Sequence, residues 1–226
     1  MFVLSSKKSN SLSAKFRNKR ASLFLSKLKL LNKRNLTMLD MGGTIEFWMN
    51  NPVVKEVGLI STIDVVNLDC RESTEIKINT TVIRSYHGNA LEVNNKNGNR
   101  FDVVHSNSVI EHVGNLSDQY RMAKKCEELR LYYWVQTPYK FFPIEPHFYF
   151  PFFAYLPLTM RSYLHQRFDM GFMKREPNWL KARISCENTR LLTVGELKSF
   201  FQHCDIIKER FIGFNKSIIA TNIELK

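Results

Sequence analysis

The sequence predicts an α/β fold in which a mostly parallel sheet of seven strands carries helices on both faces. Short apolar runs of strand type alternate with helical runs along the 226 residues, which is typical of parallel crossover units. The last two strand candidates flank Gly213 and predict an antiparallel C-terminal hairpin. With 44% apolar residues, the chain has enough apolar material for a sizeable core.

Each predicted element has its own local signal. The strands are short and apolar, and they span 36–41, 60–68, 81–85, 101–106, 131–136, 206–211 and 217–221. Helices are expected over 12–32, 44–47, 117–130 and 194–201. The last helix opens with a capping box at Thr193 and Glu196. The polar stretch 94–100 is expected to be a turn.

Basic charge is concentrated at the amino terminus. Residues 1–39 hold ten Lys and Arg and no acidic residue, so the net charge of +12 falls to +2 in the remainder. A body that gripped a nucleic-acid duplex would be basic across one face, which is not evident here. We therefore expect a basic arm with an amphipathic helix over 1–35, then a domain over 36–226 with a loop insertion at about 137–190.

The amino-terminal helix has two interpretations that the sequence leaves open. Its apolar stripe follows helical spacing and consists of Ala21, Phe24, Leu25, Leu28 and Leu31. The stripe packs on the domain, or the helix uses its basic residues to contact an anionic membrane or RNA.

The cysteines and the hydropathy pattern bear on location. The four cysteines lie at positions 70, 126, 186 and 204 without metal-binding spacing, which favours reduced thiols in the cytoplasm. No run approaches the ~18 apolar residues of a spanning helix. We expect a cytoplasmic protein, with peripheral membrane contact through the basic helix as the alternative. The oligomeric state is left open.

Two predicted strands end in residues suited to a ligand. The first ends at Asp40 and runs into Gly42 and Gly43, where the backbone can approach a ligand without a Cβ clash. The second closes on Asp69, whose carboxylate can accept hydrogen bonds from two ribose hydroxyls. Ligands bind at the carboxyl ends of parallel strands, so these residues are expected to share one pocket.

Together with the run Phe-Asp-Val-Val-His-Ser-Asn-Ser-Val-Ile-Glu-His at 101–112, these residues resemble the class I S-adenosylmethionine-dependent methyltransferases. The resemblance implies a Rossmann-like sheet and S-adenosyl-L-methionine as cofactor. It implies that the cofactor is bound by Asp40, Gly42, Gly43, Asp69, Asn89, Ala90 and Asn107. It is strongest over residues 36–137.

The chain departs from that family in two places. Ile45 stands near an expected glycine, and Asn89 replaces an expected aspartate, which adds an amide donor. Some relatives bind a divalent cation through a Glu-x-x-Glu-His cluster. Here Ser108 stands at the first Glu position and leaves only Glu111 and His112, so we expect no metal.

The aromatic and proline-rich stretch after the fifth strand is expected to form an active-site loop. It resembles a bacterial subgroup with a Phe-Pro-Ile-Glu-Pro-His loop, present here at 142–147. His147 could take a proton from the acceptor while Glu145 orients its ring, although a satellite hydrophobic cluster is an equal alternative. Tyr139, Lys140 and Phe141 are the expected acceptor-binding residues.

The sequence thus predicts an S-adenosylmethionine-dependent methyltransferase that acts on oxygen or nitrogen of a small or lipid-linked acceptor. One alternative is an RNA methyltransferase that uses the basic arm as a tether. The other is a binding protein that kept the fold without turnover.

Overall fold

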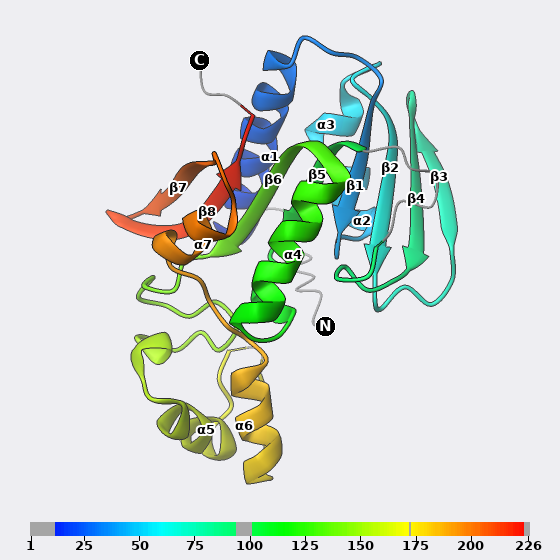
Figure 1. The fold of residues 1–226 in the computed structure, drawn as a ribbon. Coiled ribbons are helices and arrows are strands. Elements are labelled where there is room, and N and C mark those ends of the chain that lie inside the picture. The colour runs from blue at the N-terminus through cyan, green and yellow to red at the C-terminus, as the bar shows by residue number, and fades with distance from the viewer. Residues whose placement is uncertain (1–11, 94–100, 172, 224–226) are drawn as a thin grey trace. The chain divides into compact units, whose positions relative to one another are not determined.

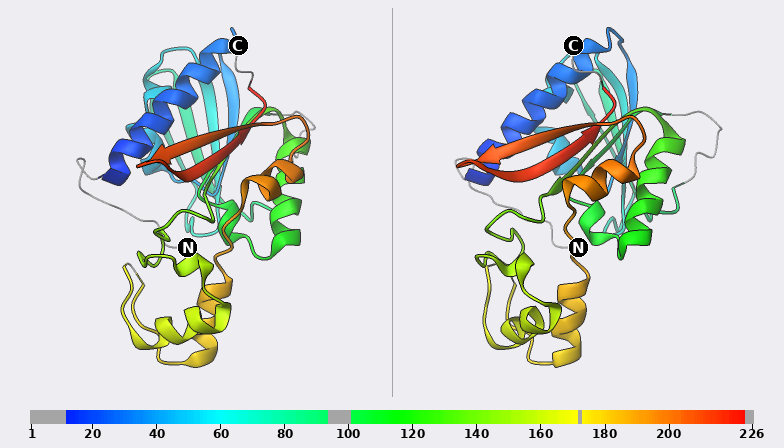
Figure 2. Two further views of the ribbon diagram at one scale, coloured as in Figure 1. Left: turned by 90° about the vertical axis from the view of Figure 1, so that its left-hand side faces the viewer. Right: turned by 60° about the vertical axis from the view of Figure 1, so that its left-hand side comes forward.

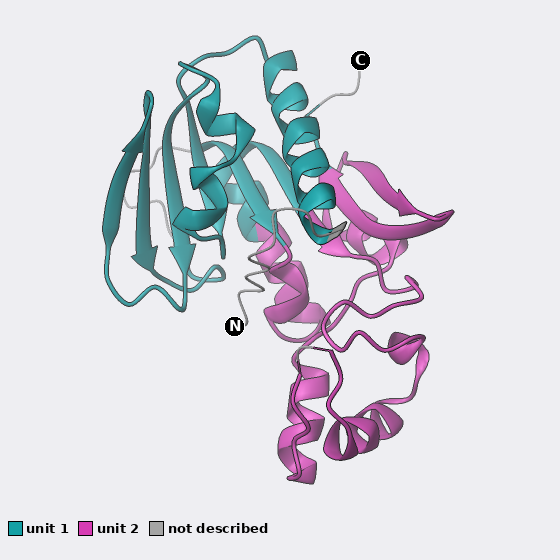
Figure 3. Cartoon of the chain, turned by 180° about the vertical axis from the view of Figure 1, so that it is seen from behind, with its two compact units in different colours: residues 1–107, 125–135, 221–226 teal, residues 108–124, 136–220 magenta. Residues whose placement is uncertain are grey.

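The computed structural model describes residues 12–93, 101–171 and 173–223 (Figure 1). The expected turn at 94–100 and the start of the expected basic arm, 1–11, lie outside the described residues. The chain forms two compact units (Figure 3). Unit 1 consists of residues 1–107, 125–135 and 221–226, and unit 2 consists of residues 108–124 and 136–220.

Eight strands form one sheet in the order β3-β4-β2-β1-β5-β6-β8-β7. The strands are β1 (Leu36–Met41), β2 (Ile60–Asn67), β3 (Thr74–Ile78), β4 (Thr81–His87), β5 (Phe101–Asn107), β6 (Arg130–Pro138), β7 (Asp205–Phe211) and β8 (Phe214–Thr221). β1 pairs in parallel with both β2 and β5, and β2 pairs in parallel with β4. The predicted Rossmann-like α/β class is confirmed, and the strand order changes direction between β1 and β5.

The sheet has one strand more than the seven predicted. β3 pairs antiparallel with β4 at the sheet edge, with Ile76 opposite Ile83. Its residues Thr-Glu-Ile-Lys-Ile are mostly exposed, and charged side chains are common on edge strands, where they discourage aggregation. The alternation of Ile76 and Ile78 with Glu75 and Lys77 is too short to distinguish this strand from a turn in the sequence.

The predicted C-terminal hairpin is present. Only two residues, Ile212 and Gly213, connect β7 to β8, and both have positive φ, at 47° and 80°. Positive φ at both central positions is the requirement of a type I′ turn, whose twist matches that of paired strands.

Seven α-helices and two short 3₁₀ segments are found among the described residues. They are α1 (Leu12–Leu30), α2 (Ile45–Met49), α3 (Pro52–Lys55), α4 (Leu116–Leu129), α5 (Leu158–Arg167), α6 (Trp179–Glu187), α7 (Val194–Phe200), η1 (Ile110–His112) and η2 (Phe153–Tyr155). The predicted capping box at Thr193 and Glu196 opens α7. Among these helices none is both long and apolar enough to span a lipid bilayer.

Helices lie on both faces of the sheet in unit 1 (Figure 2), and successive side chains of β1 contact them in turn. Asp40 points to the face where Trp48 of α2 lies, and the Trp48 Nε1 atom donates to its carboxylate at 2.7 Å. The next residue, Met41, points to the other face, where Cys126 of α4 lies 3.4 Å from its sulfur. Successive strand residues face opposite sides, so one dipeptide contacts both helical layers.

The stripe of the predicted amino-terminal helix packs on the sheet, which is the first of its two interpretations. Phe24 and Leu28 of α1 are buried. The ring of Phe24 lies 5.1 Å from both His105 of β5 and Trp134 of β6. The apolar face of α1 is therefore core rather than a free surface.

Unit 2 has a small core of its own within the expected insertion at 137–190. Phe148, Phe153, Met170 and Cys186 form this buried cluster, and the partly buried side chains of Leu156, Leu158, Leu164 and Met173 pack against it. The satellite hydrophobic cluster considered from the sequence is therefore present. The segment contains α5 and α6, which the sequence does not predict.

Candidate functional site

The side chain of Asn67, the last residue of β2, joins the loops that follow three parallel strands. Its amide nitrogen donates to the carbonyl oxygens of Gly42 at 3.3 Å and Gly43 at 2.7 Å. Its Oδ1 accepts from the backbone N–H of Asp69 at 2.9 Å. The backbone carbonyl oxygen of Asn67 accepts from the backbone N–H of Gly88 at 3.2 Å. The glycine turn, Asp69 and the Gly88 loop therefore meet at one edge of the sheet.

The turn after β1 uses its two glycines for different reasons. Gly42 has a φ of 80° and donates its N–H to the carbonyl of Val66 at 2.7 Å. A Cβ on Gly43 would lie 1.7 Å from the Oδ2 atom of Asp40, so any other residue would displace that carboxylate. Gly42 is thus required by conformation and Gly43 by close packing.

Asp40 is deeply buried and its carboxylate is engaged within the protein. Oδ2 accepts from Trp48 Nε1 at 2.7 Å, and Oδ1 lies 2.8 Å from Nδ1 of His105. The side chain of Asp40 is only 1% exposed. In this structure Asp40 packs against Gly43, and both of its carboxylate oxygens already have partners. Its carboxylate is therefore not placed for the predicted contact with a cofactor amino group.

The other predicted cofactor residues lie at the same edge of unit 1. Asp69 is exposed, whereas Asn89 and Asn107 are half-buried and Ala90 is buried. Asn89 is fixed within its loop, because its Oδ1 accepts from the N–H of Leu91 and its nitrogen donates to Glu92. Asn107 ends β5, next to β1 in the sheet. The structure therefore brings this predicted set together.

Unit 2 contains a cluster of titratable side chains around the predicted catalytic pair. Nδ1 of His147 lies 2.6 Å from Glu145 Oε1, and the other Glu145 oxygen accepts from the N–H groups of His147 and Phe148. Nε2 of His147 lies 3.1 Å from Nε2 of His112. Glu111 adjoins them, with Oε2 accepting from the Thr137 hydroxyl at 2.9 Å.

Burial and mutual charge give these groups unusual protonation. Burial raises the pKa of Glu111 to about 7, and burial together with the neighbouring His147 lowers the pKa of His112 to about 4. Burial alone would lower the pKa of His147, but its hydrogen bond to Glu145 and the two carboxylate charges raise it. When His147 is protonated, its Nε2 donates to Nε2 of His112, and His147 can act as a base only after Nε2 has lost that proton.

The same cluster offers three ligands for a divalent cation. One donor atom each from Glu111, His112 and His147 lies within 4.8 Å of the others. The Oε1 atom of Glu111 is buried and has no hydrogen-bond partner among the described residues. Glu145 on Nδ1 of His147 is the carboxylate–histidine arrangement that orients metal ligands. His147 thus adds a third possible ligand to Glu111 and His112, the two on which the expectation of no metal is based.

The predicted acceptor-binding residues separate in the structure. Lys140 lines a cavity of unit 2, whereas Tyr139 and Phe141 do not belong to the cavity wall. The rings of Tyr139 and Phe141 stack edge-on at 5.7 Å, and Phe141 is 43% exposed.

Several site residues are absent from the sequence predictions. Asn67 could have been found, because an Asn two residues before Asp69 is typical of an Asx turn. Trp48 and Thr137 carry no such signal, since their roles depend on partners that the fold brings to them.

Comparison with known proteins supports the fold. No family model matches the sequence, and no curated protein matches it. The structure is similar to the N-methyltransferase NodS from Bradyrhizobium japonicum WM9, solved with S-adenosyl-L-homocysteine, with a TM-score of 0.54 and 7% identity. That match covers 96% of this chain and 89% of NodS.

Two further structures show how far the likeness extends. A Rhodobacter sphaeroides protein named for zinc-dependent alcohol dehydrogenases matches with a TM-score of 0.55 and 10% identity, over 90% of this chain and 88% of that one. The small RNA methyltransferase HEN1 matches with a TM-score of 0.50 and 13% identity, over 90% of this chain but 24% of HEN1. Such identities show the shared fold alone, because one fold hosts several chemistries.

We predict that Gly43→Ala lowers the free energy of unfolding by about 3 kcal/mol, because the new methyl group displaces Asp40 from two buried hydrogen bonds. Urea unfolding measures this loss. The control is Gly195→Ala in α7, where the nearest atom lies 4.0 Å from the new Cβ and helix propensity should add about 0.5 kcal/mol. Equal effects of the two substitutions would contradict the close packing of Gly43.

We predict that Zn²⁺ or Mn²⁺ raises the Tm of chelator-treated protein by about 5 °C when the ion is at about 100 times its Kd. Glu111→Gln removes one anionic ligand and should abolish the rise. The control is Glu128→Gln, which neutralises an exposed carboxylate on α4. A rise that Glu111→Gln leaves intact would place the ion elsewhere.

Proposed function

We propose that this protein is an S-adenosylmethionine-dependent methyltransferase. The observation that carries the proposal is the meeting of the Gly42–Gly43 turn, Asp69 and the Gly88–Ala90 loop around Asn67. These loops follow β1, β2 and β4 beside the change of direction in strand order, which is where open α/β sheets bind nucleotide-like ligands.

In this proposal each loop of unit 1 contacts a different part of the methyl donor. The exposed carboxylate of Asp69 accepts from the ribose hydroxyls, and the glycine turn lets the backbone approach the methionine portion. Asn89 and Ala90 adjoin the adenine, and Asn107 at the end of β5 lies beside the methionine portion. Asp40 acts by holding the turn in place.

We assign the residues that handle the methyl acceptor to unit 2. Methyl transfer moves a methyl cation equivalent from sulfur to an acceptor oxygen or nitrogen, which loses a proton. His147, oriented by Glu145, receives that proton once Nε2 is free. A divalent cation held by Glu111, His112 and His147 would instead supply positive charge that makes an acceptor hydroxyl more acidic.

The proposal predicts that S-adenosylhomocysteine binds the protein and that Asp69→Ala weakens its affinity about tenfold to hundredfold, through loss of charge-assisted hydrogen bonds to the ribose. Isothermal titration calorimetry measures both. Asp205→Ala, which removes another exposed carboxylate at the start of β7, is the control and should leave the affinity unchanged. Folded protein that shows no binding of S-adenosylhomocysteine would end the proposal.

Turnover is tested separately from cofactor binding. We expect the protein to transfer label from a labelled methyl donor to one small molecule in fractionated cell extract, and His147→Ala to slow that transfer about 10²- to 10⁴-fold. The affinity for S-adenosylhomocysteine should not change, because the predicted cofactor residues belong to unit 1. Cofactor binding without labelling of any fraction would favour the non-catalytic alternative, and labelled RNA would favour the RNA alternative.

A further inference from the structure

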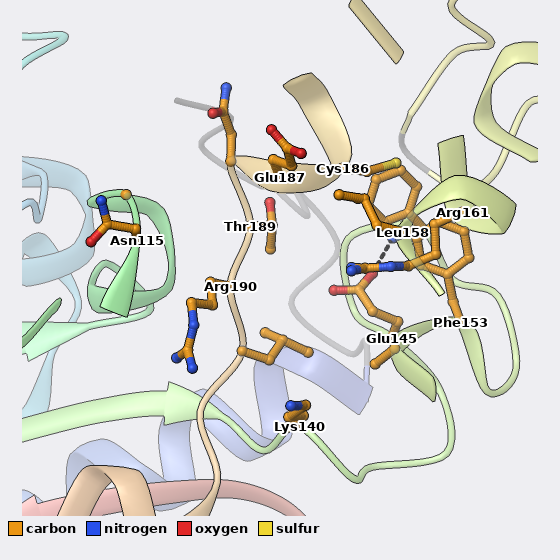
Figure 4. A pocket seen from close by; sticks show the side chains of 15 residues that line it. Asn115, Lys140, Glu145, Phe153, Leu158, Arg161, Cys186, Glu187, Thr189 and Arg190 are labelled. Carbon is orange, nitrogen blue, oxygen red and sulfur yellow. Dashed lines mark hydrogen bonds between the residues drawn. The ribbon is translucent and has the colours of Figure 1, made fainter. Parts of the chain in front are cut away.

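Unit 2 contains a cavity of about 510 Å³, which is the size of a site for a small organic molecule (Figure 4). Its apolar lining includes Phe148, Phe153, Leu158 and Leu191. The others include charged groups, which are Lys140, Glu145, Arg161, Glu187 and Arg190. The cavity is therefore amphipathic.

The charges of the cavity wall do not cancel. Each carboxylate already has a partner outside the cavity lining, because Glu145 is hydrogen-bonded to His147 and Glu187 lies 3.2 Å from Arg183. Arg190 is paired with Glu196. The remaining two cations, Lys140 and Arg161, form no ion pair with any residue that the structure describes.

Of these two cations, Arg161 gives the stronger evidence for a missing anionic partner. Its Nε atom is buried and has no hydrogen-bond partner within the described part of the chain. A buried N–H without an acceptor costs free energy, so it signals a missing partner. Glu145 also lines the cavity (Figure 4), but no ion pair joins it to Arg161 within the described residues. Glu145 is already bonded to three donors.

The wall of the cavity is fixed to the titratable cluster. The backbone N–H of Arg190 donates to the carbonyl of Glu111 at 2.8 Å, and that of Lys140 donates to Leu192 at 3.0 Å. The side chain of Gln119 donates to the carbonyl of Arg190 at 2.7 Å. Glu145 lines the cavity and is also hydrogen-bonded to His147, so a ligand in the cavity would lie next to the carboxylate that orients His147.

We infer that this cavity binds an organic anion with an apolar body, whose carboxylate or phosphate is held by Arg161 and Lys140. A guanidinium with a free buried N–H matches the planar geometry of either group, and the aromatic rings cover the apolar body. Identifying this anion as the methyl acceptor rests on the proposed function. The binding itself does not.

The test uses the full chain without methyl donor and four probes: 3-phenylpropanoate, 2-phenylethyl phosphate and the neutral analogues 3-phenylpropanamide and 2-phenylethanol. Titration followed by NMR should give at least one anion about tenfold greater affinity than its neutral analogue. The better anion identifies the head group. Equal affinity of both anions and their analogues, or no saturable binding at millimolar concentration, would overturn the inference.

Variants assign the effect to this cavity. Arg161→Gln should reduce the anion to the affinity of its neutral analogue, and Arg161→Lys should restore part of the difference. Arg167→Gln is the control, because that residue is on the same helix with its guanidinium over the Tyr163 ring. An equal loss in Arg167→Gln would overturn the inference. Lys140→Gln gives a second measurement if Arg161→Gln does not fold, and an unchanged anion preference there would also count against it.

Binding of S-adenosylhomocysteine by the same samples separates the two proposals. Anion preference without cofactor binding would leave the cavity assignment standing while the methyltransferase proposal fails. Cofactor binding without anion preference would leave the methyltransferase proposal standing while the cavity assignment fails.

Discussion

The candidate donor site depends on one side-chain amide at the end of β2. Asn67 uses the nitrogen and oxygen of its side-chain amide, together with its backbone carbonyl, to join segments that lie up to 25 residues away in sequence. Only a group with donor and acceptor on one short side chain can do this, because an aspartate in its place would face carbonyl oxygens with no proton to give. The backbone of the glycine turn is thus fixed before any ligand arrives, and little ordering entropy remains to be lost on binding.

A second constraint lies beneath that turn. Asp40, Trp48 and His105 form a buried polar group whose hydrogen bonds are all internal, and Phe24 from α1 covers it. A buried carboxylate is tolerated because donors satisfy it, and the absence of a side chain on Gly43 leaves room for it. The helix predicted as part of a basic arm therefore has a packing role at the candidate site.

Local patterns in the sequence predict most of the sheet and the loops at the carboxyl ends of its strands. Buried strands such as 36–41 and 101–107 are marked by their own apolar residues, and the glycines and Asp69 follow them directly. What they could not give depends on distant partners. His112 and His147 are 35 residues apart and meet only through the fold, so the third possible metal ligand was missed. α5 and α6 pack on each other, and nothing in their short sequences distinguishes them from a loop.

The small core of Phe148, Phe153, Met170 and Cys186 has an implication for how such proteins diversify. It gives the segment that bears Arg161 an interior independent of the one beneath the glycine turn. Substitutions around that cavity can accumulate without disturbing Asn67 or Asp40. Under the proposed function, residues that contact the methyl acceptor can therefore change while the loops proposed to bind the methyl donor stay the same.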